Sequence, residues 1–201
     1  RDFEYDRLVL SPGFDFIYGG IEGYDAKAQE TILHAWKAGP QTLALRKQLE
    51  DLPDGGTYVL SVPKAPYRCP PGPYERASQI AWYFKTHKPR SKVIVLDAND
   101  KVISKEKLFL GVWESDYKGI LEYRPGWNVV AVDAVTNIVT SELGDKERGE
   151  VLNLLPPQRA ADIARVAGVV NVNDRWADVD WISLESTAVK NIHILGDALQ
   201  A

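Results

Sequence analysis

The chain reads Thr57-Tyr58-Val59-Leu60-Ser61-Val62-Pro63, passes through a loop, and continues as the helix-like run Glu75–His87 and the apolar run Ser91–Asp97. Aromatic and β-branched residues in the first run favour a strand. The continuous apolar run at Ser91–Asp97 is typical of a buried parallel strand. Strand, helix and strand in this order predict an α/β unit, in which ligands and chemistry gather at the turn after a strand.

The turn before the helix carries Cys69, the single cysteine of the 201 residues, within Tyr67-Arg68-Cys69-Pro70-Pro71-Gly72-Pro73-Tyr74-Glu75-Arg76-Ala77. A dinucleotide-binding turn needs glycines, so that the backbone can approach the pyrophosphate. The prolines of this turn have no N–H to offer a phosphate. Asp97 does end the next strand, as the acidic residue of a ribose-binding strand would. We therefore interpret the unit as an α/β domain that has exchanged nucleotide binding for thiol chemistry.

Cys69 is the first candidate functional residue. A lone cysteine is most often a small, inert core residue. Here the dipole at the start of the following helix favours the thiolate, and Arg68 adds to that effect. Only the thiolate is a good nucleophile toward sulfur. The position of Cys69 therefore favours a reactive thiol.

Glu75 is the second candidate, six residues after Cys69. An acidic residue in the first turn of a helix is commonly only a dipole partner or cap. The functional alternative is proton transfer, for which desolvation by Tyr67 and Tyr74 would prepare the carboxyl group. The residues alone leave both readings open.

Composition excludes several classes of function. The chain is 45% hydrophobic, which is enough to bury a core. A net charge of −4 argues against nucleic-acid binding. No apolar run approaches the ~20 residues of a membrane span. His34, His87 and His193 lack the spacing of metal ligands, so no metal site is predicted.

Strand-like and helix-like segments alternate along the chain, which predicts an α/β fold. The expected strands are 5–12, 57–62, 91–97, 129–132, 137–140, 150–155 and 192–195. The expected helices are 26–36, 41–52, 77–85, 104–117 and 160–167.

The run Cys69–Ala77 resembles the flavoprotein subunit of flavocytochrome c sulfide dehydrogenase. The resemblance extends over nearly the whole chain, through Tyr5–Gly13, Ile21–Asp25, His34–Gly39, Lys85–Val93, Val151–Gln158 and Ile192–Ala198. The last run is similar to the late flavin motif of disulfide reductases and sulfide:quinone reductases. The resemblance implies a Rossmann-like fold of the disulfide-reductase type, with an incomplete FAD-binding domain at 1–23 and 167–201. The inserted βαβ domain at 24–166 would be NAD-like and carry the redox cysteine.

The resemblance also implies roles for individual residues. Cys69 aligns with one of two redox cysteines beside the flavin, and Glu75 with an acidic residue proposed to donate or accept a proton. Asp197 aligns with an aspartate that contacts the ribityl chain of FAD, and Gly196 would let the backbone approach the cofactor. Without the resemblance, an aspartate at this place is often only a helix N-cap.

The chain departs from that family in several respects. It has no Gly-x-Gly-x-x-Gly turn for the FAD diphosphate, contains no methionine and begins with Arg1. The cysteine that tethers FAD covalently in the family is missing, and the second redox cysteine is expected beyond Ala198. We interpret the chain as a middle fragment of a protein of roughly 400 residues, two to three domains by length. Such a fragment is expected to bind FAD poorly and to be inactive alone.

The activity implied by the resemblance is oxidation of sulfide to sulfur. Sulfide or polysulfide would react at a disulfide containing Cys69, FAD would take two electrons, and a cytochrome c subunit would accept them singly. The resemblance also implies a bacterial periplasmic location. A sulfide:quinone reductase and a non-catalytic module that docks a cytochrome are the alternatives.

Overall fold

The structure is a computed structural model and describes residues 4–200. Its internal contacts divide the chain into two compact units. The central unit comprises 18–65 and 69–157, and the flanking unit comprises 1–17, 66–68 and 158–201. These boundaries fall after 17 and 157, whereas the sequence predicted boundaries after 23 and 166. The flavin-binding and NAD-like characters of the two parts stay predictions.

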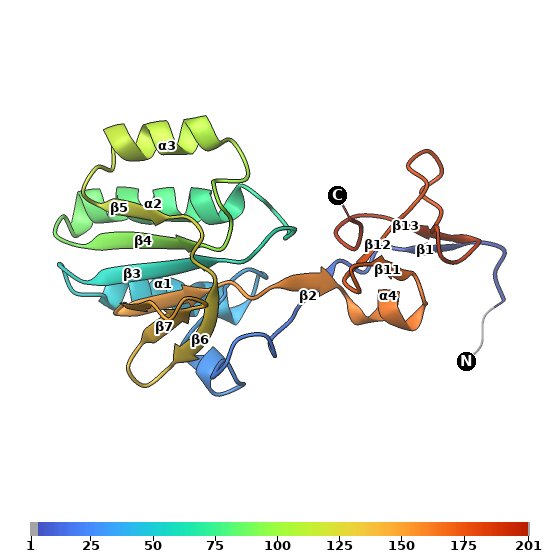
Figure 1. Ribbon diagram of the computed structural model, residues 1–201, viewed down its shortest axis with the longest axis horizontal. Coiled ribbons are helices and arrows are strands. Elements are labelled where there is room, and N and C mark those ends of the chain that lie inside the picture. The colour runs from blue at the N-terminus through green and yellow to red at the C-terminus, as the bar shows by residue number, and fades with distance from the viewer. Residues whose placement is uncertain (1–3, 201) are drawn as a thin grey trace. The chain divides into compact units, whose positions relative to one another are not determined.

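A four-stranded parallel sheet in the order β5-β4-β3-β9 forms the centre of the central unit. Its strands are β3 (Thr57–Val62), β4 (Lys92–Asp97), β5 (Leu121–Arg124) and β9 (Val151–Leu154). Helix α1 (Pro40–Asp51) precedes β3, α2 (Gly72–His87) connects β3 to β4, and α3 (Glu106–Ser115) connects β4 to β5. This arrangement confirms the predicted α/β unit around the cysteine loop (Figure 1).

A second, antiparallel sheet packs on one face of the parallel sheet. It consists of β6 (Val129–Asp133), β7 (Ile138–Ser141) and β8 (Lys146–Arg148). Alternate strand residues point to one face of a sheet, and here Val59, Ile94 and Leu152 share a buried cluster with Val132 and Val139. Figure 1 shows β6 and β7 on this side and α2 and α3 on the other. Both faces of the parallel sheet are thereby covered, as such sheets require.

The opposite face holds an aromatic cluster that joins α2, α3 and β5. The ring centres of Tyr74 and Phe109 are 5.6 Å apart, and those of Trp113 and Tyr123 are also 5.6 Å apart. Phe109 and Trp113 close the chain of contacts at 5.7 Å. Aromatic pairs in such tilted arrangements add stabilisation beyond the area that they bury.

Asp97 is fully buried at the carboxyl end of β4 and accepts four hydrogen bonds from the chain itself. Its Oδ2 accepts from the hydroxyls of Tyr74 at 2.8 Å and Tyr123 at 2.9 Å. Its Oδ1 accepts from the backbone N–H of Asn99 at 2.9 Å and from the Asn99 side chain at 2.7 Å. Asp97 occupies the place of a ribose-binding acid, but its oxygens serve the fold.

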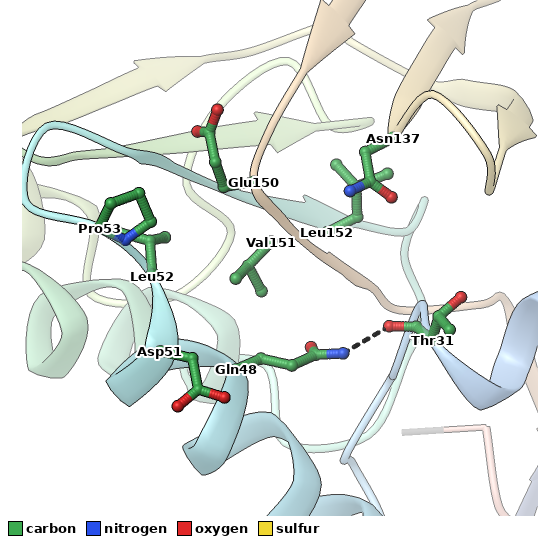
Figure 2. A pocket seen from close by; sticks show the side chains of 9 residues that line it. All are labelled: Thr31, Gln48, Asp51, Leu52, Pro53, Asn137, Glu150, Val151 and Leu152. Atoms are coloured by element: carbon green, nitrogen blue, oxygen red, sulfur yellow. Dashed lines mark hydrogen bonds between the residues drawn. The ribbon is translucent and has the colours of Figure 1, made fainter.

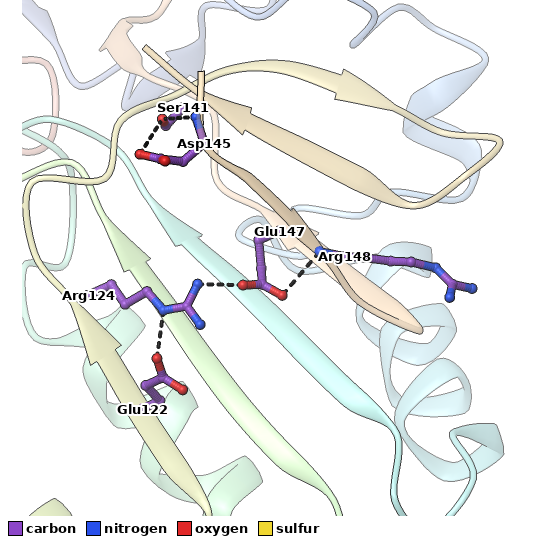
Figure 3. A network of polar contacts seen from close by, with 6 residues as sticks. All are labelled: Glu122, Arg124, Ser141, Asp145, Glu147 and Arg148. Atoms are coloured by element: carbon purple, nitrogen blue, oxygen red, sulfur yellow. Dashed lines mark hydrogen bonds and ion pairs between the residues drawn. The ribbon is translucent and has the colours of Figure 1, made fainter. Parts of the chain in front are cut away.

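Arg124 connects the edge of the parallel sheet to the antiparallel sheet (Figure 3). Its Nε pairs with Glu122 on the same strand at 2.7 Å, and its Nη1 pairs with Glu147 on β8. The pair between Arg124 and Glu147 therefore ties the short strand β5 to the second sheet.

The flanking unit contains three short strand pairs. β1 (Leu8–Leu10) pairs in parallel with β13 (Ile192–Ile194), β2 (Phe14–Phe16) pairs with β10 (Gln158–Ala160), and β11 (Val170–Val172) pairs with β12 (Trp176–Ala177). Helix α4 (Asp162–Val166) completes the unit. Its core is built around the fully buried Trp176 and Ile194.

The helix predicted for 26–36 is wrong. Only a 3-10 turn, η1 (Ala28–Glu30), forms there, and Leu33 then lies beside Asn153 of β9 in a parallel bridge. The Asn153 side chain donates to the carbonyls of Leu33 at 2.5 Å and His34 at 3.0 Å. These tertiary hydrogen bonds replace the ones that a helix would supply.

Other elements differ in extent. The predicted helix at 160–167 is shortened to α4, because Gln158–Ala160 pairs with β2 instead. The predicted strand at 5–12 shrinks to β1. Strands β5 and β8 were not predicted, because both are short and rich in charged residues and depend on partners far away in the sequence.

We predict that Tyr123→Phe lowers the free energy of unfolding by about 1.5–3 kcal/mol, the range for a hydrogen bond to a charged group. Burial, followed by the charge of Asp97, raises the pKa of Tyr123, which keeps its hydroxyl a donor. Urea denaturation measures the effect. Tyr117→Phe is the control, and an equal loss in that variant would contradict the role given to Asp97.

Candidate functional site

Cys69 lies in the turn between β3 and α2, at the carboxyl end of the parallel sheet, and is exposed. Its carbonyl accepts a hydrogen bond from the N–H of Gly72 at 2.8 Å. Pro71 and Pro73 stand at the start of α2, where a helix needs no N–H from them. Cys69 has φ 58°, a left-handed conformation that is rare for a residue other than glycine. The turn thus presents the thiol to solvent in a conformation that its surroundings must maintain.

The indole of Trp36 and the sulfur of Cys69 converge over the backbone of Gly72. A Cβ on residue 72 would lie 2.7 Å from Trp36 Cη2 and 3.0 Å from Cys69 Sγ. At 2.7 Å the Trp36 ring would have to shift, and at 3.0 Å the sulfur would have to give way slightly, so the close packing favours glycine at this position. Sequence reasoning assigned no role to Trp36; the glycine among the prolines of the loop is the signal that a close approach occurs there.

Arg76 fixes the segment that carries Trp36. Its Nη1 donates to the carbonyl of His34 and to Asn153 Oδ1, both at 2.8 Å, and its Nη2 donates to the carbonyl of Ala35 at 2.6 Å. The guanidinium carbon lies 4.8 Å from the centre of the Trp36 ring, in a cation–π arrangement. Ala35 is held at φ 45°, the second left-handed non-glycine residue near the thiol.

His34 is buried, with 7% of its surface exposed. Its Nδ1 accepts a hydrogen bond from the N–H of Trp36 at 3.0 Å, which requires an unprotonated Nδ1. Burial, followed by the charges of Lys37 and Arg76, lowers the pKa of His34 to about 4. The imidazole is therefore neutral near pH 7 and acts as a fixed acceptor for the loop.

Glu75 lies in the first turn of α2 and is exposed. The hydroxyl of Tyr74 points away from it, into the core, where it binds Asp97. The predicted desolvation of the Glu75 carboxyl group is therefore wrong for this structure, since solvent reaches the side chain. Its place on α2, six residues after Cys69, keeps it a candidate for proton transfer.

Gly196 and Asp197 follow β13 in the flanking unit. Gly196 has φ 77°, and no atom lies within 4 Å of the place where its Cβ would be. Asp197 is exposed, and its charge raises the pKa of Arg68 against the larger lowering effect of burial. The glycine leaves space beside the backbone and the carboxylate is free to accept a hydroxyl, so this turn fits the predicted contact with a ribityl chain.

A hollow of about 270 Å³ lies at the other end of the parallel sheet, by the amino ends of β3 and β9 (Figure 2). Asp51, Glu150 and Gln48 supply oxygen atoms to its lining, and the Gln48 side chain donates to the carbonyl of Thr31 at 2.7 Å. None of the predicted site residues lines it. Within residues 4–200, no three His, Cys, Asp or Glu side chains gather in a way that would hold a metal ion.

We predict that Gly72→Ala lowers the melting temperature and changes the rate at which iodoacetamide alkylates Cys69, because the new methyl group must displace the Trp36 ring or the thiol. Gly111→Ala in α3 is the matched control, since its Cβ would meet nothing within 4 Å. That control is expected to be neutral or stabilising, as alanine is favoured over glycine in helices. Equal behaviour of the two variants would contradict the close approach at Gly72.

We also predict that His34 makes stability depend on pH. The folded pKa of His34, about 4, lies below the ordinary histidine pKa of 6.5, so the unfolded chain binds the proton more readily between these values. The His34 contribution is therefore complete above pH 6.5 and declines as the pH falls toward 4. His34→Asn, which keeps an acceptor for the Trp36 N–H, should flatten the curve of unfolding free energy over this range. His87→Asn, at an exposed histidine, is the control for the loss of a histidine.

Comparisons with known proteins agree with this architecture. Residues 42–156 match the family model of the central part of the sulfide dehydrogenase [flavocytochrome c] flavoprotein chain. In solved structures, the chain superposes on the sulfide:quinone oxidoreductase of Aquifex aeolicus with a TM-score of 0.71 and 17% identity, covering 98% of this chain and 47% of that one. It superposes on a pyridine nucleotide-disulfide family oxidoreductase of Enterococcus faecalis with a TM-score of 0.68 and 15% identity, covering 98% of this chain and 42% of that one.

A chain in the mitochondrial ATP synthase structure of Tetrahymena thermophila gives a TM-score of 0.69 and 20% identity, covering 98% of this chain and 51% of that one. Such low identities show the fold alone, and the chain spans about half the length of the proteins that it matches. The fold is thus the α/β fold of the disulfide-reductase type that was predicted. The family match extends over more than half of the chain. The chain therefore belongs to the central-domain family of the flavocytochrome c sulfide dehydrogenase flavoproteins.

Proposed function

We propose that the flavoprotein containing this chain oxidises sulfide to sulfur and passes the electrons to a cytochrome c subunit. The observation that carries the proposal is the exposed Cys69 at the β3–α2 turn, inside the segment that matches the sulfide dehydrogenase family. The supported alternative is a sulfide:quinone reductase, since the fold is also that of the Aquifex aeolicus enzyme. No helix within residues 4–200 has the length and apolar character to cross a bilayer.

Cys69 would act as one half of a disulfide with a thiol from outside this chain, because it is the single cysteine here. A hydrosulfide anion donates an electron pair to one sulfur of the disulfide, the S–S bond breaks, and the other sulfur leaves as a thiolate. The added sulfur stays bound as a persulfide. The left-handed turn at Cys69 exposes the sulfur to this attack.

Glu75 would accept the proton that the bound S–H group releases. It lies in the same helical turn as the end of the cysteine loop, and its exposed position lets it pass that proton to solvent. A carboxylate with this role is a general base. Exposure also means that Glu75 is expected to modulate the rate rather than to determine it.

FAD, when bound, supplies the two-electron acceptor for this chemistry. Gly196 and Asp197 are the residues of this chain that would hold it, the first by leaving space beside the backbone and the second by accepting a ribityl hydroxyl. A diphosphate cradle of the Gly-x-Gly-x-x-Gly type does not occur in residues 1–201. A periplasmic location belongs to this proposal.

We predict that Cys69→Ser in the FAD-loaded flavoprotein abolishes sulfide-dependent reduction of cytochrome c while FAD stays bound. Glu75→Gln is expected to slow turnover by about 10-fold or less and to alter its pH profile, within the range of general base catalysis. Glu114→Gln, at an exposed glutamate of α3, is the control for lost charge. Parallel assays with a soluble quinone identify the acceptor. Full activity in Cys69→Ser would overturn the proposal.

A further inference from the structure

Arg76 is a partly buried cation without a carboxylate partner among residues 4–200. The described arginine ion pairs belong to Arg46, Arg90, Arg124, Arg159 and Arg165. The guanidinium of Arg76 donates only to uncharged oxygens, two carbonyls and the amide oxygen of Asn153. Burial lowers the pKa of Arg76, which shows that the environment disfavours its charge. Placing an unpaired charge away from water costs stability. We therefore looked for a function of the Arg76 guanidinium.

One aromatic ring relates this charge to the thiol. The guanidinium carbon lies over the Trp36 ring, 4.8 Å from its centre. The outer edge of the same ring and Cys69 Sγ both come within 3.0 Å of the point where a Gly72 Cβ would lie. The indole thus faces Arg76 with its π surface and approaches the thiol with its rim.

The segment that presents the indole is fixed from several directions. Ala35 donates its N–H to Gln41 Oε1 at 2.9 Å, and Trp36 donates its own to His34 Nδ1 at 3.0 Å. The carbonyls of His34 and Ala35 bind Arg76. The left-handed backbone at Ala35 persists only because these contacts determine it.

We propose that Arg76 is a positioning residue for Cys69: it holds Trp36 against the thiol, and its charge favours small anionic sulfur species there. In naming hydrosulfide and polysulfide anions as those species, the inference rests on the proposed function. The apolar, polarisable rim of Trp36 suits sulfur atoms, and the cation behind it suits their negative charge. Lys37 and Glu75 also flank the site, but both are exposed, and solvent screens their charges more than that of Arg76.

The test compares alkylation of Cys69 by iodoacetate, an anion, and iodoacetamide, its neutral analogue of similar size. Because the chain has one cysteine, mass spectrometry of the intact chain reports on Cys69 alone. A change in the exposure of the thiol affects both alkylation rates alike, so it cancels in their ratio. A free thiol in the same buffer gives the reference ratio, and the unmodified chain is expected to exceed it by about 3- to 10-fold. A ratio equal to that of the free thiol overturns the proposal without any variant.

Variants then locate the effect. Arg76→Gln is expected to lose this preference, whereas Arg76→Lys keeps most of it because the charge remains. Lys92→Gln removes a cation at the opposite end of the sheet and should leave the ratio unchanged. If Arg76 acts through Trp36, Arg76→Gln should change the ratio by less than about 2-fold in a Trp36→Ala background. An unchanged ratio in Arg76→Gln, or equal losses in Gln and Lys variants, would overturn the proposal.

The outcome is separate from that of the proposed function. Absence of sulfide oxidation by the FAD-loaded flavoprotein would refute the proposed function, while an Arg76-dependent alkylation ratio would still establish the positioning role. Sulfide oxidation with an alkylation ratio that ignores Arg76 would refute the positioning role alone. Circular dichroism of each variant identifies those that fold.

Discussion

The hydrogen bonds from Arg76 to the carbonyls of His34 and Ala35 are the interaction on which the arrangement around Cys69 depends. They connect α2 to a segment that lies 41 and 42 residues before Arg76 in the sequence and contains no helix or strand. Because the cysteine loop leads into α2, the same helix sets both the position of the thiol and that of Trp36. Both sides of the candidate site are thus attached to the same helix.

The first turns of α2 are anchored a second time, by Tyr74 and its hydrogen bond to Asp97. Asp97 is a buried carboxylate and Arg76 a partly buried cation, and neither pairs with an opposite charge among the described residues. Each is instead surrounded by neutral groups, hydroxyls and amides for Asp97 and carbonyls and an amide for Arg76. Such contacts satisfy the hydrogen-bonding groups of Asp97 and Arg76 but do not neutralise their charges. The sheet can therefore be well packed while the charge of Arg76 remains available for the role that we propose beside the thiol.

Sequence patterns were sufficient for the parts of the fold that follow from local chemistry. The apolar runs predicted β3, β4 and β9, and the prolines before Glu75 were compatible with a helix start. The same reasoning failed at 26–36, where a helix was predicted. Hydrogen bonds from Asn153 and Arg76 to backbone carbonyls hold the end of this segment in an irregular conformation instead. It also missed β5, because Leu121–Arg124 forms a strand through its pairing with β4, which the local sequence does not indicate. At the candidate site, the loop sequence pointed to Cys69, which stays a prediction, whereas nothing local pointed to Trp36 and Arg76, since their contacts join distant segments.

The positions that would contact a nucleotide in a dinucleotide-binding unit are filled differently in this α/β unit. In a dinucleotide-binding unit, the turn after the first strand offers N–H groups to phosphates, and an acid after the second strand accepts from the ribose. In this chain, prolines remove N–H donors from the turn. The carboxylate oxygens of Asp97 accept hydrogen bonds from Tyr74, Tyr123 and Asn99. Both changes make the carboxyl end of the sheet more rigid, because groups that would await a ligand are bound internally. A rigid edge suits the proposed role of the thiol, since Cys69 and Ala35 must be held in left-handed backbone conformations that are rare for residues other than glycine. The prolines of the turn and the internally bonded Asp97 therefore both help to fix the position of the thiol.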